Sequence, residues 1–240
     1  MIIKMKSSIK ELRHICKKPY WGFLQERCHR ISIYITWLLV CTPITPNQVT
    51  IFWVLIQLLS PFLLITGKYS YMLTGILLFH FAFILDCVDG QLARYKKIYS
   101  VKGMYIDKLG HHISIPLLLV CLSIGVFEIY NNILYLIFGA LALFSFLYTK
   151  LFIYGIPEQA QIKLKKLKKD FSFKNKKRRV RTFLFELIRI EEPLNILFWC
   201  ILLGYPNYAL IIYSVLFFFG MLRTLVKTFI SLKKIDKKEI

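Results

Sequence analysis

Paired cysteines are missing from this sequence. Its six cysteines include no C-x-x-C spacing, the pattern typical of zinc sites and thiol redox centres. Most of them lie in apolar stretches or near clusters of Lys and Arg, as expected of reduced, structural thiols. They stand at positions 16, 28, 41, 87, 121 and 200. We therefore exclude a disulfide framework and a zinc centre.

Acidic residues are also few: 13 Asp and Glu stand against 33 Lys and Arg, which gives a formal net charge of +20. Such a charge can indicate nucleic-acid binding. However, hydrophobic residues make up 57% of the chain, far above the share in a soluble domain. Basic clusters beside apolar stretches are explained more simply by anionic lipid headgroups. We expect membrane lipids as partners and no nucleic acid.

A cleavable secretion signal is missing too, because the first apolar run follows amphipathic sequence and no A-x-A-like site comes after it. Nothing in the chain repeats, so we expect one domain over residues 1–240. The low-complexity segment 160–181 is basic with interleaved apolar residues. We expect it to be a cytoplasmic loop lying on the membrane, with a guide for an anionic acceptor lipid as the alternative.

Long apolar stretches predict an all-α, polytopic membrane protein. Six of them are candidate transmembrane helices: 49–67, 70–88, 104–127, 131–154, 192–205 and 207–231. The fifth is the shortest. The apolar run 31–41 is too short to span a membrane, so we expect residues 1–44 to form two interfacial amphipathic helices, with Cys28 and Ile31 on the apolar face of the second. We call residues 1–44 the collar, beside a six-span core at 45–240.

The distribution of Lys and Arg predicts the orientation. With the N-terminus in the cytoplasm and six crossings, 32 of the 33 basic residues fall on the cytoplasmic side and only Lys68 falls outside. An odd number of spans would destroy this positive-inside asymmetry. We therefore expect an integral membrane protein, in a bacterial inner (cytoplasmic) membrane, whose polar motif faces the cytoplasm.

That motif, DCVDGQLARYKKIYSVKGMYIDKLGH (86–111), places three aspartates at the water-facing ends of two apolar stretches. Carboxylates beside hydrocarbon are costly, so such a cluster favours a cation site. Asp86 and Asp89 share one helix face, and Asp107 and His111 share another. Two adjacent helix ends would aim three carboxylates and an imidazole at one point, a ligand set that suits Mg²⁺ or Mn²⁺.

The pattern D-x₂-D-G-x₂-A-R-x₈-G-x₃-D-x₃-[acid] resembles the signature of the CDP-alcohol phosphotransferases, or CDP-alcohol phosphatidyltransferases. The likeness is strongest over residues 45–112. Seven fixed positions are filled at the right spacing, by Asp86, Asp89, Gly90, Ala93, Arg94, Gly103 and Asp107; the eighth, usually Asp, is His111.

The resemblance implies an enzyme that transfers a phospho-alcohol or phosphatidyl group from a CDP-linked donor, CDP-diacylglycerol or a CDP-alcohol, to a lipid or polyol acceptor. CMP is released, and the product belongs to phospholipid or lipid-linked glycan precursor synthesis. The resemblance also implies a homodimer.

By chemistry and by this resemblance, Asp86, Asp89 and Asp107 are the expected ligands of a Mg²⁺ or Mn²⁺ ion that neutralises charge on the leaving phosphate. Arg94 carries a planar fork of donors suited to a phosphate, and the resemblance directs it at the CDP moiety. The alternative for Arg94 is snorkelling at the membrane edge.

Small residues are expected to let the nucleotide and the helices approach closely. They are Gly90, Ala93 and Gly103; for Gly103, close helix packing alone is an equally good interpretation. Asn47, in TPNQVT (45–50), can cap a helix. Similar Pro-Asn-x-x-Thr starts lie near the substrate cleft in relatives, so a direct substrate role for Asn47 is the alternative.

His111 departs from the family pattern, which puts its role in question. Neutral imidazole can deprotonate an acceptor hydroxyl, as the family's fourth acid does, or hold a metal. The alternative is an eroded site. We expect His112 to serve packing or a neighbouring contact, and His80 to be a buried, hydrogen-bonded histidine.

No motif in the sequence identifies the acceptor. Polar residues near the cytoplasmic ends of the last two spans are candidates for binding it, although snorkelling explains the basic ones equally well. They are Arg189, Glu191, Glu192, Arg223 and Lys227. Two rival classes stay open: a catalytically inactive CDP-alcohol-binding relative, and a membrane transporter, which would carry its acidic residues near mid-membrane.

Overall fold

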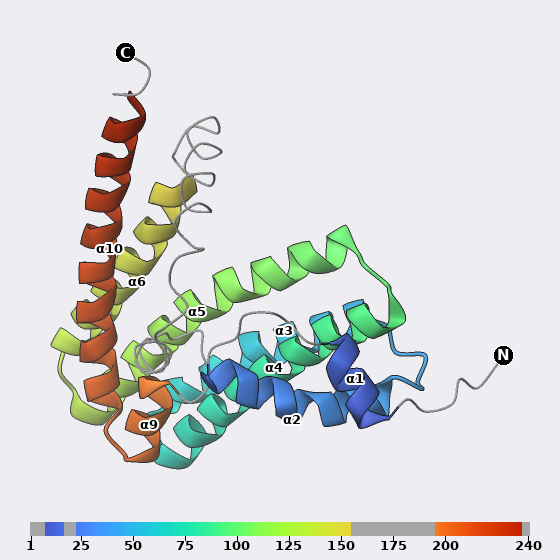
Figure 1. Ribbon diagram of the computed structural model, residues 1–240. Coiled ribbons are helices and arrows are strands. Elements are labelled where there is room, and N and C mark those ends of the chain that lie inside the picture. The colour runs from blue at the N-terminus through green and yellow to red at the C-terminus, as the bar shows by residue number, and fades with distance from the viewer. Residues whose placement is uncertain (1–7, 17–22, 155–194, 237–240) are drawn as a thin grey trace.

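The structure is a computed structural model that describes residues 8–16, 23–154 and 195–236 (Figure 1). These residues form helices joined by short turns and no strand, which confirms the predicted all-α class. In chain order the helices are α1 (Ile9–Ile15), α2 (Phe23–Leu39), α3 (Pro46–Leu59), the 3₁₀ helix η1 (Ser60–Thr66), α4 (Tyr69–Lys96), α5 (Val101–Tyr130), α6 (Leu134–Tyr154), α9 (Ile196–Leu202) and α10 (Pro206–Asp236).

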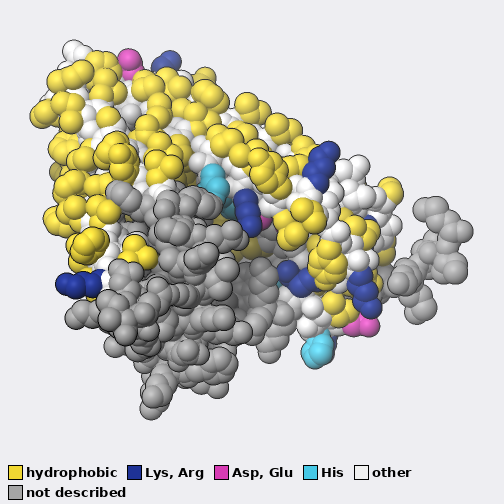
Figure 2. All heavy atoms as spheres, turned by 90° about the horizontal axis from the view of Figure 1, so that it is seen from above, with side chains coloured by type: hydrophobic (Ala, Val, Ile, Leu, Met, Phe, Trp, Pro, Cys, Tyr) yellow, Lys and Arg dark blue, Asp and Glu magenta, His cyan; other side chains and the backbone are white. Residues whose placement is uncertain are grey.

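Four helical stretches are long and apolar enough to cross a membrane: Pro46–Thr66, Tyr69–Lys96, Val101–Tyr130 and Pro206–Lys233. A shorter apolar stretch, Leu134–Thr149, lies in α6. These five match the first, second, third, sixth and fourth predicted spans. Many large apolar side chains on them are exposed, and Figure 2 shows hydrophobic side chains over most of the described surface on one face. Lipid is the solvent that suits such a surface, so the chain is an integral membrane protein.

The fifth predicted span, 192–205, is described only from Asn195 onward. There α9 has seven residues and ends at Leu202. At 1.5 Å per residue α9 is roughly 10 Å long, about a third of the hydrocarbon thickness of a bilayer. The total of six spans therefore stays a prediction.

A capping box fixes the start of α3. Oγ1 of Thr45 accepts a hydrogen bond from the Gln48 N–H at 3.4 Å, and Oε1 of Gln48 accepts one from the Thr45 N–H at 2.8 Å. Pro46 occupies the first turn, where its missing N–H costs nothing. The interpretation of Asn47 as a cap is therefore wrong, because Thr45 satisfies the free N–H groups and Asn47 lies inside the first turn.

The helices form two groups. In the first, α3 and η1 pack against both α4 and α5; in the second, α6 and α10 lie side by side (Figure 1). One large apolar core joins η1, α4, α5, α6, α9 and α10. Close packing is required where α5 meets η1, because a Cβ added at Gly125 would strike the carbonyl oxygen of Leu64.

The collar contains two helices, as predicted, and both pack against α4. Leu12 and Cys16 are fully buried at the α1 end. On the predicted apolar face of α2, Cys28 is buried and Ile31 is 52% exposed, as a helix whose apolar face contacts lipid allows. The face of α2 that packs on α4 also carries Ser32 and Thr36, whose hydroxyls meet a polar side chain of α4.

Candidate functional site

The turn between α4 and α5 brings the two halves of the motif to one place. Lys97 ends α4 in the left-handed conformation (φ 55°), with its N–H bonded to the Ala93 carbonyl. Ser100 caps α5 and accepts a hydrogen bond from the Gly103 N–H at 3.1 Å. The last turns of α4 and the first turns of α5 therefore face a common space beside α3.

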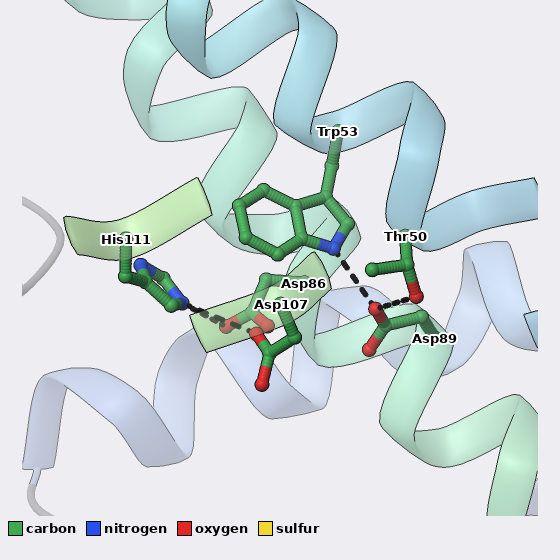
Figure 3. A network of polar contacts seen from close by, with 6 residues as sticks. All are labelled: Thr50, Trp53, Asp86, Asp89, Asp107 and His111. Carbon is green, nitrogen blue, oxygen red and sulfur yellow. Dashed lines mark hydrogen bonds and ion pairs between the residues drawn. The ribbon is translucent and has the colours of Figure 1, made fainter. Parts of the chain in front are cut away.

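Asp86, Asp107 and His111 converge in that space (Figure 3). Nε2 of His111 lies 3.5 Å from Oδ1 of Asp107 and 3.8 Å from Oδ2 of Asp86. One donor atom from each of the three residues lies within 4.8 Å of the others. The side chains are half-buried, between 24% and 38% exposed, so the cluster is partly shielded yet reachable. Two carboxylates and an imidazole are chemically suited to a divalent cation.

Asp89, the remaining predicted ligand, is held to one side by α3. Its Oδ2 accepts hydrogen bonds from Oγ1 of Thr50 at 2.6 Å and from Nε1 of Trp53 at 2.9 Å. Figure 3 shows Asp89 apart from the convergence of Asp86, Asp107 and His111. Both hydrogen bonds reach the same oxygen, so Oδ1 of Asp89 is left to face other partners.

A cavity of about 330 Å³ lies between these helices. Its walls come from α3, the last turns of α4, the connecting turn and the start of α5. They are Pro46, Asn47, Thr50, Asp89, Gly90, Ala93, Arg94, Ile98, Tyr99, Ser100, Gly103, Met104 and Asp107. Seven of the nine predicted site residues are in this set, and the other two, Asp86 and His111, adjoin Asp107.

Arg94 lies along one wall of the cavity. Its guanidinium folds over Gly90, where an added Cβ would stand 3.4 Å from Nη1. The nearest side chain to Gly90 is therefore Arg94 of its own helix rather than a residue of a neighbouring helix. Nε of Arg94 is buried and has no hydrogen-bond partner among the described residues. A buried cationic donor of this kind is suited to an anionic ligand in the cavity.

Gly103 and Asn47 face each other across the cavity wall. A Cβ added at Gly103 would overlap Oδ1 of Asn47, so a larger residue there requires the Asn47 side chain to move. The two interpretations of Gly103, close packing and contact with the ligand, therefore both find support, because the residue lines the cavity and touches α3.

The other predicted residues lie elsewhere. His80 is buried, with Phe198 at 5.3 Å between ring centroids, but its Nε2 has no hydrogen-bond partner among the described residues, so the expected hydrogen bond is not found there. His112 is exposed. Arg223 and Lys227 are exposed on α10 and do not line the cavity. Arg189, Glu191, Glu192 and the segment 160–181 lie outside the described residues.

Sequence reasoning missed Trp53 and assigned no role to Thr50. Trp53 is fully buried, and its ring centroid lies 5.0 Å from that of His111 at an interplanar angle of 36°. It therefore touches both parts of the site, through its N–H at Asp89 and its face at His111. The sequence contains one indication of this role: Thr50 and Trp53 both carry hydrogen-bond donors and lie three residues apart, on one face of an apolar helix.

Comparison with known families identifies the chain. The family model for CDP-alcohol phosphatidyltransferases matches residues 43–217 of the 240. A comparison with curated proteins finds no match. The matched range contains the motif 86–111 and every residue that lines the cavity. This chain therefore belongs to the CDP-alcohol phosphatidyltransferase family.

Proposed function

We propose that this protein transfers a substituted phosphate group from a CDP-linked donor to a hydroxyl-bearing lipid or polyol acceptor and releases CMP. One observation carries the proposal: a cluster of two carboxylates and an imidazole adjoins a cavity lined by Arg94. Membership of a phosphotransferase family supports the same reaction class.

The family uses a divalent metal. Asp86, Asp107 and His111 would hold it here, with Asp89 next to them. Their oxygen-rich donor set suits Mg²⁺ or Mn²⁺. When bound, the ion supplies charge neutralisation at the pyrophosphate and so makes CMP a better leaving group.

Arg94 binds the donor's phosphates in this proposal, because its guanidinium is the cationic side chain in the cavity wall. Thr50 and Trp53 orient Asp89 by their two hydrogen bonds to Oδ2. Gly90 and Ala93 have small side chains or none, so the nucleotide can lie close to the backbone of α4. Ile98 and Met104 add apolar surface to the wall.

The acceptor oxygen attacks the phosphorus that carries the alcohol. A new P–O bond forms to the acceptor, the P–O bond to CMP breaks, and the hydroxyl proton passes to a base. Nε2 of His111 faces the two carboxylates, so it can serve either as a ligand or as that base, but not as both at once. We favour the ligand role, and Asp89 through Oδ1 is then the available proton acceptor.

The cytoplasmic orientation and the bacterial inner membrane complete the proposal. The three aspartates and the histidine of the motif lie in the halves of α4 and α5 next to the connecting turn, rather than at the far ends of the helices. They are Asp86, Asp89, Asp107 and His111. Lys96, Lys97 and Lys102 lie in and beside this turn, and the positive-inside pattern assigns them to the cytoplasm. The predicted homodimer belongs to the same proposal.

The test is release of radiolabelled CMP by the purified protein, with CDP-diacylglycerol or soluble CDP-alcohols, and with Mg²⁺ or Mn²⁺. We expect release with one donor class, and its loss in Asp107→Asn. A protein that binds the donor with Mg²⁺ but never releases CMP would support the inactive alternative. Ion or solute flux through proteoliposomes without CMP release would support a transporter.

A further inference from the structure

Gln91 lies within the motif at a position that the family signature leaves open. Its side chain is fully buried and is absent from the cavity wall. The side-chain amide is bonded to the collar instead. Nε2 donates to Oγ of Ser32 at 2.7 Å and to the His29 carbonyl at 3.1 Å, and Oε1 accepts from Oγ1 of Thr36 at 2.5 Å.

These hydrogen bonds fix the register of α2 on α4. Ser32 and Thr36 are one helical turn apart, so both hydroxyls meet the same amide in one register only. A slide of α2 along α4 would leave a buried amide without partners, and leaving such a group unsatisfied is costly. The Gln91 contacts therefore act as a clamp between the collar and the motif helix.

A second fastening lies at the end of α4. Nζ of Lys96 donates to the carbonyls of Thr42 at 2.7 Å and of Ile44 at 2.8 Å. Both carbonyls belong to the last residues of the collar, just before the capping box of α3. The motif helix is thus tied to the collar at Gln91 and at Lys96, three residues before and two residues after Arg94.

Arg94 itself is in contact with the collar. Burial raises the pKa of the Cys16 thiol, and the neighbouring Arg94 guanidinium partly offsets that rise. Sγ of Cys16 also lies 3.5 Å from the backbone carbonyl of Gln91. Arg94 therefore lies between the end of α1 and the cavity.

We infer that Gln91 is a positioning residue, which holds the collar on α4 so that Arg94 stays presented to the phosphates of the CDP-linked donor. The inference rests on the proposed function, and it gives the collar a task beyond membrane anchoring. Ser32 and Thr36 are its partners on α2.

The first test replaces Gln91 by methionine, which keeps the length of the side chain and removes its hydrogen bonds. We expect the KM for the CDP-linked donor to rise about five- to tenfold, because Gln91→Met removes all three hydrogen bonds between Gln91 and the collar. The kcat and the KM for the acceptor should stay at the wild-type values. A fall in kcat with an unchanged donor KM would overturn the inference.

The control is Gln57→Met. Gln57 is a second buried glutamine, on α3, whose Oε1 has no partner among the described residues. It lies outside the cavity wall, so this substitution should leave the donor KM unchanged. An equal rise in both variants would mean that any buried glutamine matters through stability alone, and it would overturn the inference.

A variant on the collar side guards against misfolding of Gln91→Met. Thr36→Val keeps the shape of the side chain and removes the hydroxyl that bonds Gln91. Thr36 is remote from the cavity wall, yet we expect it to raise the donor KM in the same way. The double variant should be no worse than Gln91→Met alone, because both changes break one interaction. Strict additivity would contradict the clamp.

Docking of the collar can be read without any enzyme activity. In a variant whose only cysteine is Cys16, the thiol is fully buried and should react slowly with maleimide in membranes. Gln91→Met should speed this labelling, and Gln57→Met should not. Unchanged labelling in Gln91→Met overturns the inference even if CMP release is confirmed. If no donor releases CMP from the wild-type protein, the proposed function is wrong. The labelling of Cys16 still shows whether Gln91 holds the collar on α4.

Discussion

The indole N–H of Trp53 donates to Oδ2 of Asp89 at 2.9 Å, across the interface between α3 and α4. The same ring lies against His111 of α5. One buried side chain from α3 thus sets how far Asp89 stands from the cluster formed by Asp86, Asp107 and His111. This separation gives Asp89 surroundings unlike those of the other two aspartates.

Trp53→Phe removes the N–H and keeps a ring beside His111. We expect CMP release to fall by about 10- to 100-fold, the usual cost of losing an outer partner of a metal site, because Asp89 beside the ligands is no longer held in place. Trp199→Phe is the matched control, because Trp199 lies on α9 outside the cavity wall. Wild-type release by a well-folded Trp53→Phe would show that Asp89 needs no such support.

Gly103→Ala tests the contact between α5 and α3. The added Cβ would overlap Oδ1 of Asn47, so the Asn47 side chain must leave its present position between α3 and α5. We expect reduced thermal stability and reduced CMP release, measured side by side. Gly220→Ala is the control, since a Cβ there has open space.

The double variant Gly103→Ala, Asn47→Ala decides whether Asn47 only packs against α5 or also contacts the substrate. If its role is packing, the smaller side chain makes room and both stability and activity recover. If Asn47 contacts the substrate, stability recovers and activity does not. Full stability of Gly103→Ala alone would contradict the steric account.

His111 is expected to act as a metal ligand, because its Nε2 faces two carboxylates. Binding of Mn²⁺, followed by electron paramagnetic resonance, should weaken in His111→Ala and survive in His111→Asp, which restores the usual acid of the motif. His112→Ala is the control, one residue along α5. Wild-type Mn²⁺ affinity in His111→Ala would rule out the ligand role.

Activity of the same variants separates ligand from base. If His111 is only a ligand, excess Mn²⁺ should restore CMP release to His111→Ala. If it is the base for an alcohol acceptor, His111→Ala should stay inactive at any metal concentration, and the wild-type rate should fall at low pH as the imidazole is protonated. A phosphate-monoester acceptor needs no base, so it would leave His111→Ala active.

The orientation can be tested with single cysteines in a cysteine-free background. Lys68 is exposed between η1 and α4, and Val101 is 80% exposed at the start of α5. A membrane-impermeant maleimide added to intact cells should label Lys68→Cys and spare Val101→Cys until the cells are opened. Labelling of Val101→Cys from outside would overturn the predicted topology.

The sequence was sufficient for the architecture because its strongest signals are local. Apolar stretches predicted five spans close to the helices observed, and the motif spacing placed Asp107 and His111 on one face, where they meet at 3.5 Å. Six of the seven fixed motif positions that the sequence fills also line one cavity.

What the sequence could not show depends on contacts between segments far apart in the chain. Asp86 and Asp89 are three residues apart, but Thr50 and Trp53 of α3 turn Asp89 away from the cluster. The sequence predicted Cys28 and Ile31 on the apolar face of α2, but not that the hydroxyls of Ser32 and Thr36 would turn inward and bond Gln91 of α4. Nothing in the sequence near Lys96 indicates that its ammonium bonds two carbonyls of the collar, 54 and 52 residues earlier in the chain.

The central claim is that Asp86, Asp107 and His111 hold a divalent cation that CMP release requires. The most direct measurement is CMP release during removal and return of the cation. EDTA should stop release, Mg²⁺ or Mn²⁺ should restore it, and Asp86→Asn and Asp107→Asn should each lose on the order of 1,000-fold even with excess cation. Full turnover in EDTA, or normal turnover by a well-folded Asp107→Asn, would contradict the account.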